Sequence, residues 1–201
     1  MPVENHVQRS RGISSSIPIL IITCKPGGEL KASLEIGDAL FKYDTTVRVE
    51  PQGHHRGVVL VWSKLPPYKA YALLVSQVLS YPYRIVPLFP DPHQLKPLVT
   101  KLREQIACVN IRCEARGALE KCNELTLKAL TTLGLRMCGK KGEGKHTLHI
   151  EGADDIIGYS ILPDNCDNYN KILQDNNHKR KCIEFAHKAN KTLETNTTNN
   201  P

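Results

Sequence analysis

The 201-residue sequence lacks the patterns of a secreted or membrane-spanning protein. Its longest apolar run, Ile17 to Cys24, contains a proline and is far shorter than the roughly 20 residues needed to cross a bilayer. No small-residue cleavage pattern follows this run, so it makes a poor signal peptide. We therefore expect a cytoplasmic protein with no membrane contact.

The sequence also lacks any Cys-x-x-Cys pair, although it contains seven cysteines. An odd number of cysteines without such a pair argues against both a disulfide framework and a zinc ribbon. We expect all seven to be reduced thiols. His178, Cys182 and His187, or Cys108 with Cys113, do not supply four ligands at zinc-finger spacing, so we expect no metal site.

Arrangements typical of catalysis are missing as well. No Ser/His/Asp, Cys/His or paired-carboxylate pattern stands out in the sequence. Gly139 to Lys145 nearly matches a phosphate-binding P-loop, but His146 stands where Ser or Thr is needed, and a strand pattern follows in place of a helix. We expect a protein that is not an enzyme and that has no cofactor.

What the sequence does contain is enough apolar material for a core and a moderate basic surplus. Hydrophobic residues make up 40% of the chain, and the net charge is +7. A positive surplus suits a polyanionic partner, because each neutralised phosphate releases counterions, but many basic proteins bind no nucleic acid.

Hydrophobic periodicity divides the chain into four parts. Residues 1–16 are polar and predict a flexible leader. Residues 17–91 predict the order strand, helix, strand, strand, helix, strand, which is typical of a ferredoxin-like sheet with two helices on one face. Residues 92–162 follow a proline-rich boundary and predict helix, strand, helix, strand, strand. Residues 163–201 predict a polar, partly disordered tail, in which 172–193 is a candidate polar helix with Leu173, Cys182, Phe185 and Ala189 loosely on one face. The expected fold class is α+β.

Two strings in the second block carry a family resemblance. Ile-Arg-Cys-Glu-Ala-Arg-Gly at 111–117 and Leu-His-Ile-Glu-Gly-Ala-Asp-Asp-Ile-Ile-Gly-Tyr-Ser-Ile at 148–161 resemble the THUMP domain. Ile-Leu-Ile-Ile-Thr-Cys-Lys-Pro-Gly-Gly-Glu at 19–29 looks like the start of stand-alone THUMP proteins related to the adaptor of tRNA cytidine acetylation. The resemblance implies a ferredoxin-like domain followed by a THUMP-like RNA-binding domain over 92–162.

The resemblance also implies a partner and a role. THUMP domains bind structured RNA, usually tRNA, and position it for a separate modification enzyme such as an acetyltransferase. We therefore expect an RNA-binding adaptor. The alternative is a protein-interaction module that dimerises or pairs through an exposed sheet edge, with no direct RNA contact. An RNA-modifying enzyme with an unrecognised site is a third, weaker hypothesis.

Seven basic side chains are the expected phosphate contacts, and we expect them to converge on one exposed surface. They are Arg112, Arg116, Lys121, Arg136, Lys140, Lys141 and Lys145. Arg112 and Arg116 are predicted at a strand end and helix start, where unpaired backbone N–H groups favour anions. The alternative interpretation is a solvated helix face with a basic loop.

Overall fold

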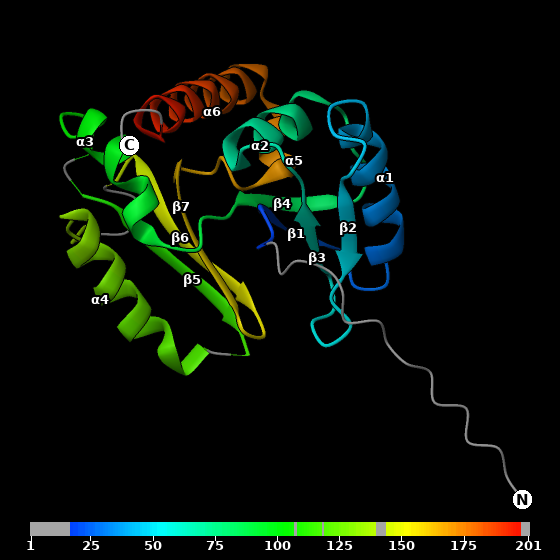
Figure 1. Ribbon diagram of the computed structural model, residues 1–201, viewed down its shortest axis with the longest axis horizontal. Coiled ribbons are helices and arrows are strands. Elements are labelled where there is room, and N and C mark those ends of the chain that lie inside the picture. Colours follow the sequence, from blue (N-terminus) through cyan, green and yellow to red (C-terminus); the bar gives the residue numbers. More distant parts are fainter. Residues whose placement is uncertain (1–16, 107, 118, 140–143, 198–201) are drawn as a thin grey trace, which may run out of the picture.

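The apolar run near the start of the chain forms the centre of the first of two sheets (Figure 1). The computed structural model describes residues 17–106, 108–117, 119–139 and 144–197. The first elements are β1 (Leu20–Cys24), α1 (Glu29–Phe41), β2 (Arg48–Pro51), β3 (Val58–Trp62), α2 (Pro67–Ser76) and β4 (Pro82–Pro87). They form an antiparallel sheet of order β2-β3-β1-β4, and the predicted order of elements is confirmed.

Both faces of this sheet are buried, which explains why β1 is apolar at successive positions. Leu20 and Ile22 pack in the core that includes α1 and α2 residues. Ile21, on the opposite face, belongs to a second apolar cluster against which Ile156 packs. Ile156 comes from the second sheet, so the two halves of the molecule share this contact.

The second sheet has three strands and the predicted order helix, strand, helix, strand, strand. Its elements are the 3-10 turn η1 (Pro92–Leu95), α3 (Lys96–Lys101), β5 (Asn110–Arg116), the 3-10 turn η2 (Leu119–Lys121), α4 (Cys122–Leu133), β6 (His146–Ala153) and β7 (Ile156–Pro163). β5 pairs parallel to β6, and β6 pairs antiparallel to β7. The helix α4 ends, as predicted, at Gly134, which adopts the left-handed conformation with φ 63°.

The helix predicted within 172–193 is confirmed, but the described residues after Pro163 pack on the rest of the molecule and are not a separate tail. They form α5 (Tyr169–Gln174) and α6 (Asn176–Thr197), and α6 packs on α2, α3 and β7 (Figure 1). Cys182, Ala186 and Ala189 are spaced by four and three residues and are all fully buried. Small side chains on one stripe allow close helix packing despite the polar composition.

No helix in the described ranges is long and apolar enough to span a membrane.

The prediction of seven reduced thiols is also wrong. Disulfides join Cys108 to Cys138, Cys113 to Cys122 and Cys166 to Cys182, and Cys24 is a buried free thiol. The partners are 9 to 30 residues apart, so the fold brings them together and no short motif marks them. Disulfides are rare in cytosolic proteins, so these three bonds argue against the cytoplasmic localisation that the sequence predicts.

Substituting Ala189 with Glu is expected to destabilise the protein, because the new carboxylate is buried without a partner between α6 and its neighbours. The expected loss in the free energy of unfolding is at least about 3 kcal/mol, measured by urea denaturation. Lys188→Glu, at the exposed neighbouring position, is the matched control and should change it by less than about 0.5 kcal/mol. Equal effects of the two variants would mean that α6 does not pack as described.

Candidate nucleic-acid interface

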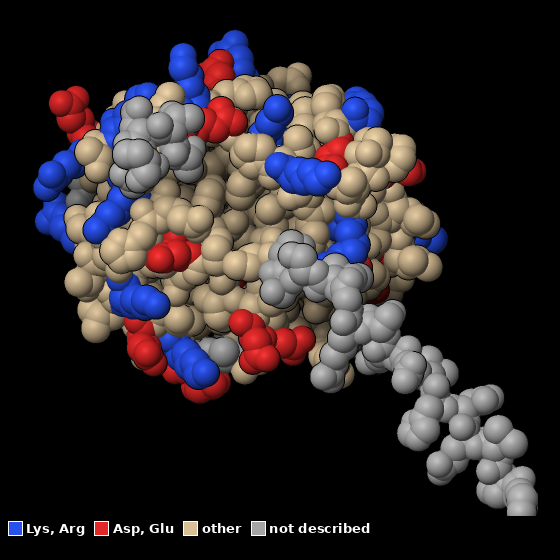
Figure 2. Space-filling view, in the orientation of Figure 1, with Lys and Arg blue, Asp and Glu red and all other residues tan. Residues whose placement is uncertain are grey.

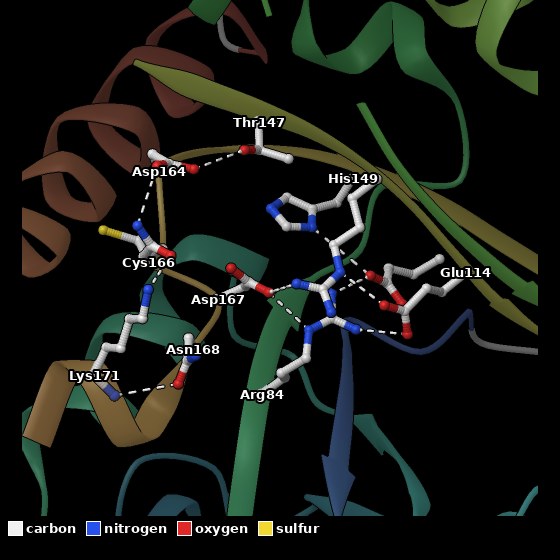
Figure 3. A network of polar contacts seen from close by, with 12 residues as sticks. Arg84, Glu114, Thr147, His149, Asp164, Cys166, Asp167, Asn168 and Lys171 are labelled. Atoms are coloured by element: carbon white, nitrogen blue, oxygen red, sulfur yellow. Dashed lines mark hydrogen bonds and ion pairs between the residues drawn. The ribbon is translucent and has the colours of Figure 1, made fainter. Parts of the chain in front are cut away.

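A buried ion cluster joins the two sheets around Arg84 of β4 (Figure 3). The guanidinium Nη2 lies 2.6 Å from Glu151 Oε1, Nε lies 2.7 Å from Asp167 Oδ2, and Nη1 lies 2.8 Å from Glu114 Oε2. The Arg84 side chain is only 11% exposed. Each of the three guanidinium nitrogens therefore has a carboxylate partner from the second half of the molecule.

The sheet register places these carboxylates together. Glu114 of β5 lies directly opposite Glu151 of β6, so both side chains leave the same face of the sheet. Asp167 follows β7 in the segment that leads into α5, where the Asp167 carbonyl also accepts a hydrogen bond from the Ile85 N–H. The cluster thus connects β4, β5, β6 and the start of the C-terminal helices.

The ion pairs lower the pKa values of Asp167 and Glu114. Burial opposes ionisation of Asp167, but attraction from His149 and Arg84, with the Arg84 hydrogen bond, outweighs it and lowers its pKa. Burial likewise opposes ionisation of Glu114, and attraction from Arg84 and a hydrogen bond from Arg112 lower its pKa. Both carboxylates are held in the charged form.

Two of the predicted phosphate contacts belong to this cluster. Arg112 Nε lies 2.7 Å from Glu114, and Arg116 Nη2 lies 3.0 Å from the same carboxylate. With Arg84, three arginines face the three carboxylates, so the charges balance. Arg112 is in the middle of β5 and not at a strand end, because the strand continues to Arg116. Neither arginine offers an unneutralised charge to a phosphate.

The other predicted contacts do not converge with these two. Lys121 borders a hollow that is also lined by Asp154 and Asp155, near the end of β5. Lys145 lies beyond the start of β5, since the neighbouring Gly144 carbonyl accepts a hydrogen bond from the Asn110 side chain. The two ends of this seven-residue strand are about 20 Å apart. The expectation of a single surface is therefore wrong for the described residues, and Lys140 and Lys141 lie outside them.

Arg136 instead lines a basic cleft between α3 and the end of α4. The cleft has a volume of about 650 Å³, and its cations are Lys96, Arg103 and Arg136. None of the described residues that line it is an Asp or Glu. Figure 2 shows several Lys and Arg side chains along the edge of the molecule where α3 and α4 lie, with Asp and Glu side chains among them.

Local structure explains how the cleft is built. Lys96, Thr100 and Arg103 are four and three residues apart, so α3 and the turn after it present them on one side. Across the cleft, the left-handed turn at Gly134 ends α4 and leads directly to Arg136. The last carbonyls of α4 carry a partial negative charge of about half an electron, which is smaller than the charge of three cations.

The sequence analysis missed Lys96 and Arg103, although the two cations are seven residues apart, about two turns of a helix. It also missed Arg84, whose position inside an apolar strand pattern was the available signal. A buried arginine needs several acceptors, and those come from residues 30 to 83 positions away, which no local pattern reveals.

Comparisons with known proteins give a weak likeness to solved structures. No protein-family model and no curated protein matches the chain. Among solved structures, PH1313 from Pyrococcus horikoshii Ot3 is similar, with 14% sequence identity and a TM-score of 0.47. The match covers 73% of this chain and 55% of PH1313, so the chain spans about half the length of that protein.

Replacing Arg84 with Met is expected to lower the free energy of unfolding by about 3 to 5 kcal/mol, because three carboxylates lose their common partner. Arg84→Lys should cause an intermediate loss of stability, since an ammonium group cannot reproduce the planar fork of three donor nitrogens. Arg180→Met, which removes the exposed pair with Glu184, is the control and should cost less than about 1 kcal/mol. Similar losses for Arg84→Met and Arg180→Met in urea denaturation would rule out a structural role for the cluster.

The cluster also predicts acid sensitivity. The pKa values of Asp167 and Glu114 are lowered in the folded protein, so their charged forms stabilise the fold above the ordinary values of about 3.9 and 4.3. This stabilisation is lost as the pH falls below about 4. The free energy of unfolding of Arg84→Met should consequently depend less steeply on pH between 5 and 3 than that of the wild type. Parallel curves for the two proteins would contradict this assignment.

Proposed function

We propose that the protein binds structured RNA, with tRNA as the leading candidate, through the basic cleft between α3 and α4. The observation that carries the proposal is the convergence of Lys96, Arg103 and Arg136 on one cleft with no Asp or Glu among its described lining residues. Phosphate neutralisation supplies most of the affinity in such contacts and is independent of sequence.

The chemistry of the cleft favours a nucleic-acid backbone over a single small anion. Thr100, Thr131 and Thr132 add hydroxyl groups beside the cations. Hydroxyl and guanidinium groups bind phosphate oxygens, and hydroxyls also bind the ribose 2′-OH that distinguishes RNA. The element orders in residues 17–91 and 92–162 support the ferredoxin-like and THUMP-like interpretation, which we keep within this proposal.

An adaptor also needs a surface for its partner enzyme, such as an RNA acetyltransferase. The outer side of α1 exposes Leu30, Leu34 and Phe41, which are 68%, 63% and 56% exposed. Their spacing of four and seven residues places them on one stripe. α1 lies at the opposite end of the molecule from α3 and α4 (Figure 1). Exposed apolar stripes of this kind favour protein contact, and this one leaves the basic cleft accessible.

The apolar stripe of α1 also favours the alternative function, a protein-interaction module. In that case the protein associates with itself and binds no RNA. Light scattering separates the two: a monomer whose mass rises only when tRNA is added supports the adaptor. A stable dimer that Leu34→Glu dissociates, with no mass increase on adding tRNA, supports the alternative.

Salt-dependent tRNA binding tests the proposed function. We expect Lys96→Ala with Arg103→Ala to weaken binding at least about tenfold and to reduce the slope of log affinity against log salt by about two. Filter binding or fluorescence anisotropy with bulk tRNA measures both. Lys25→Ala with Lys69→Ala, which removes equal charge from exposed positions in the first half of the chain, is the control.

Three results would count against it. The first is wild-type binding that does not respond to salt. The second is an absence of binding below micromolar tRNA. The third is equal weakening by the cleft pair and the control pair, which would mean that net charge and not the cleft is responsible.

A further inference from the structure

A second cluster, separate from the basic cleft, gathers metal-binding side chains at the start of α6. Cys166, His178 and Cys182 place their ligand atoms within 4.8 Å of one another. Among the described residues, no other group of three or more His, Cys, Asp and Glu side chains converges in this way. Sequence reasoning considered His178 and Cys182 but lacked Cys166, which comes from the segment after β7.

Local structure holds each of the three residues in place. His178 and Cys182 are four residues apart on α6, and His178 Nε2 lies 3.7 Å from Cys182 Sγ. The Cys166 carbonyl accepts a hydrogen bond from the buried Tyr71 hydroxyl, and its N–H donates to the Pro163 carbonyl. Both ends of the cluster are thus fixed by contacts other than the bond between the sulfurs.

We propose that Cys166, Cys182 and His178 bind one zinc ion when the disulfide between the two cysteines is reduced. A dithiol reductant supplies two electrons and two protons, and opening the S–S bond leaves two thiols. Zinc then displaces both thiol protons to the solvent, and the neutral imidazole of His178 completes three ligands. In the reverse step a small-molecule disulfide accepts two electrons and leaves as two thiolates, the S–S bond re-forms, and the ion is released.

Charge and burial favour this ion. Both cysteines are 0% exposed, so two thiolates there need a neutralising cation, and Zn²⁺ balances their charge. Sulfur and imidazole ligands select zinc over magnesium or calcium. Two lysines near the cluster have other acceptors: Lys171 Nζ donates to Asn165 Oδ1 at 2.8 Å, and Lys179 Nζ donates to the Ser76 carbonyl at 2.9 Å.

A fourth ligand is available beside the cluster. His178 and Asp175 line the same surface hollow of about 270 Å³. One Asp175 oxygen already accepts hydrogen bonds from the Asn177 and His178 N–H groups at the start of α6. Water in this hollow or the Asp175 carboxylate can complete a tetrahedral set. In either redox state, the cluster ties α6 to the segment that carries Asp167.

Cobalt(II) titration of the full chain, reduced with a phosphine and kept free of oxygen, tests the proposal. We expect one equivalent of Co²⁺ to bind, with a thiolate-to-cobalt charge-transfer band and the intense visible bands of a tetrahedral site, and Zn²⁺ to displace it. Cys182→Ser should abolish the charge-transfer band. His178→Ala, which leaves the disulfide intact for folding, should weaken Co²⁺ binding at least about tenfold after reduction.

Matched variants separate this site from the other cysteines. Cys113→Ser with Cys122→Ser, and His187→Ala on the exposed side of α6, should leave Co²⁺ binding unchanged. The proposal is overturned if the reduced chain binds no Co²⁺, if Cys182→Ser or His178→Ala binds like the wild type, or if the Cys166–Cys182 bond resists reduction in the folded protein. A reduced chain that stays unfolded in the presence of zinc overturns it equally.

Discussion

The contact of Arg84 with three carboxylates is the constraint on which the rest of the structure depends. A buried guanidinium charge is tolerated only beside opposite charges, so Glu114, Glu151 and Asp167 must stand in fixed positions around Arg84. Those positions set how β4 meets β5 and β6. Because Asp167 precedes α5, they also fix where the C-terminal helices begin, and α6 then packs across α2 and α3.

Charge balance decides which cations can take a ligand. In the Arg84 cluster the charges of three positive and three negative side chains balance, and the ion pairs connect the two sheets. In the cleft between α3 and α4, three cations meet and the described lining contributes no carboxylate. The two sites both use basic side chains, but only the first has carboxylates among its described residues. A count of lysines and arginines along the sequence cannot distinguish them.

Local sequence patterns made much of the fold predictable. The order of strands and helices and the end of α4 at Gly134 follow from periodicity and from one residue that tolerates positive φ. Pairings between distant residues were not predictable. Arg112 and Arg116 were predicted as phosphate contacts at a strand end and a helix start, but both pair with Glu114 in the cluster around the distant Arg84. The cysteine pairs were missed for the same reason, whereas the local spacing of Cys182 and Ala189 did indicate one face of α6.

The proposed adaptor role requires that its two surfaces keep a fixed relation. The basic cleft belongs to the half of the molecule that contains the second sheet, and the apolar stripe of α1 belongs to the half that contains the first. An RNA held in the cleft is positioned for an enzyme bound at α1 only if the halves do not move relative to each other. The Arg84 cluster, the shared burial of Ile156 and the packing of α6 each oppose such motion. In the proposed adaptor, the buried charges fix the relative position of the two surfaces, and the exposed charges of the cleft bind the RNA.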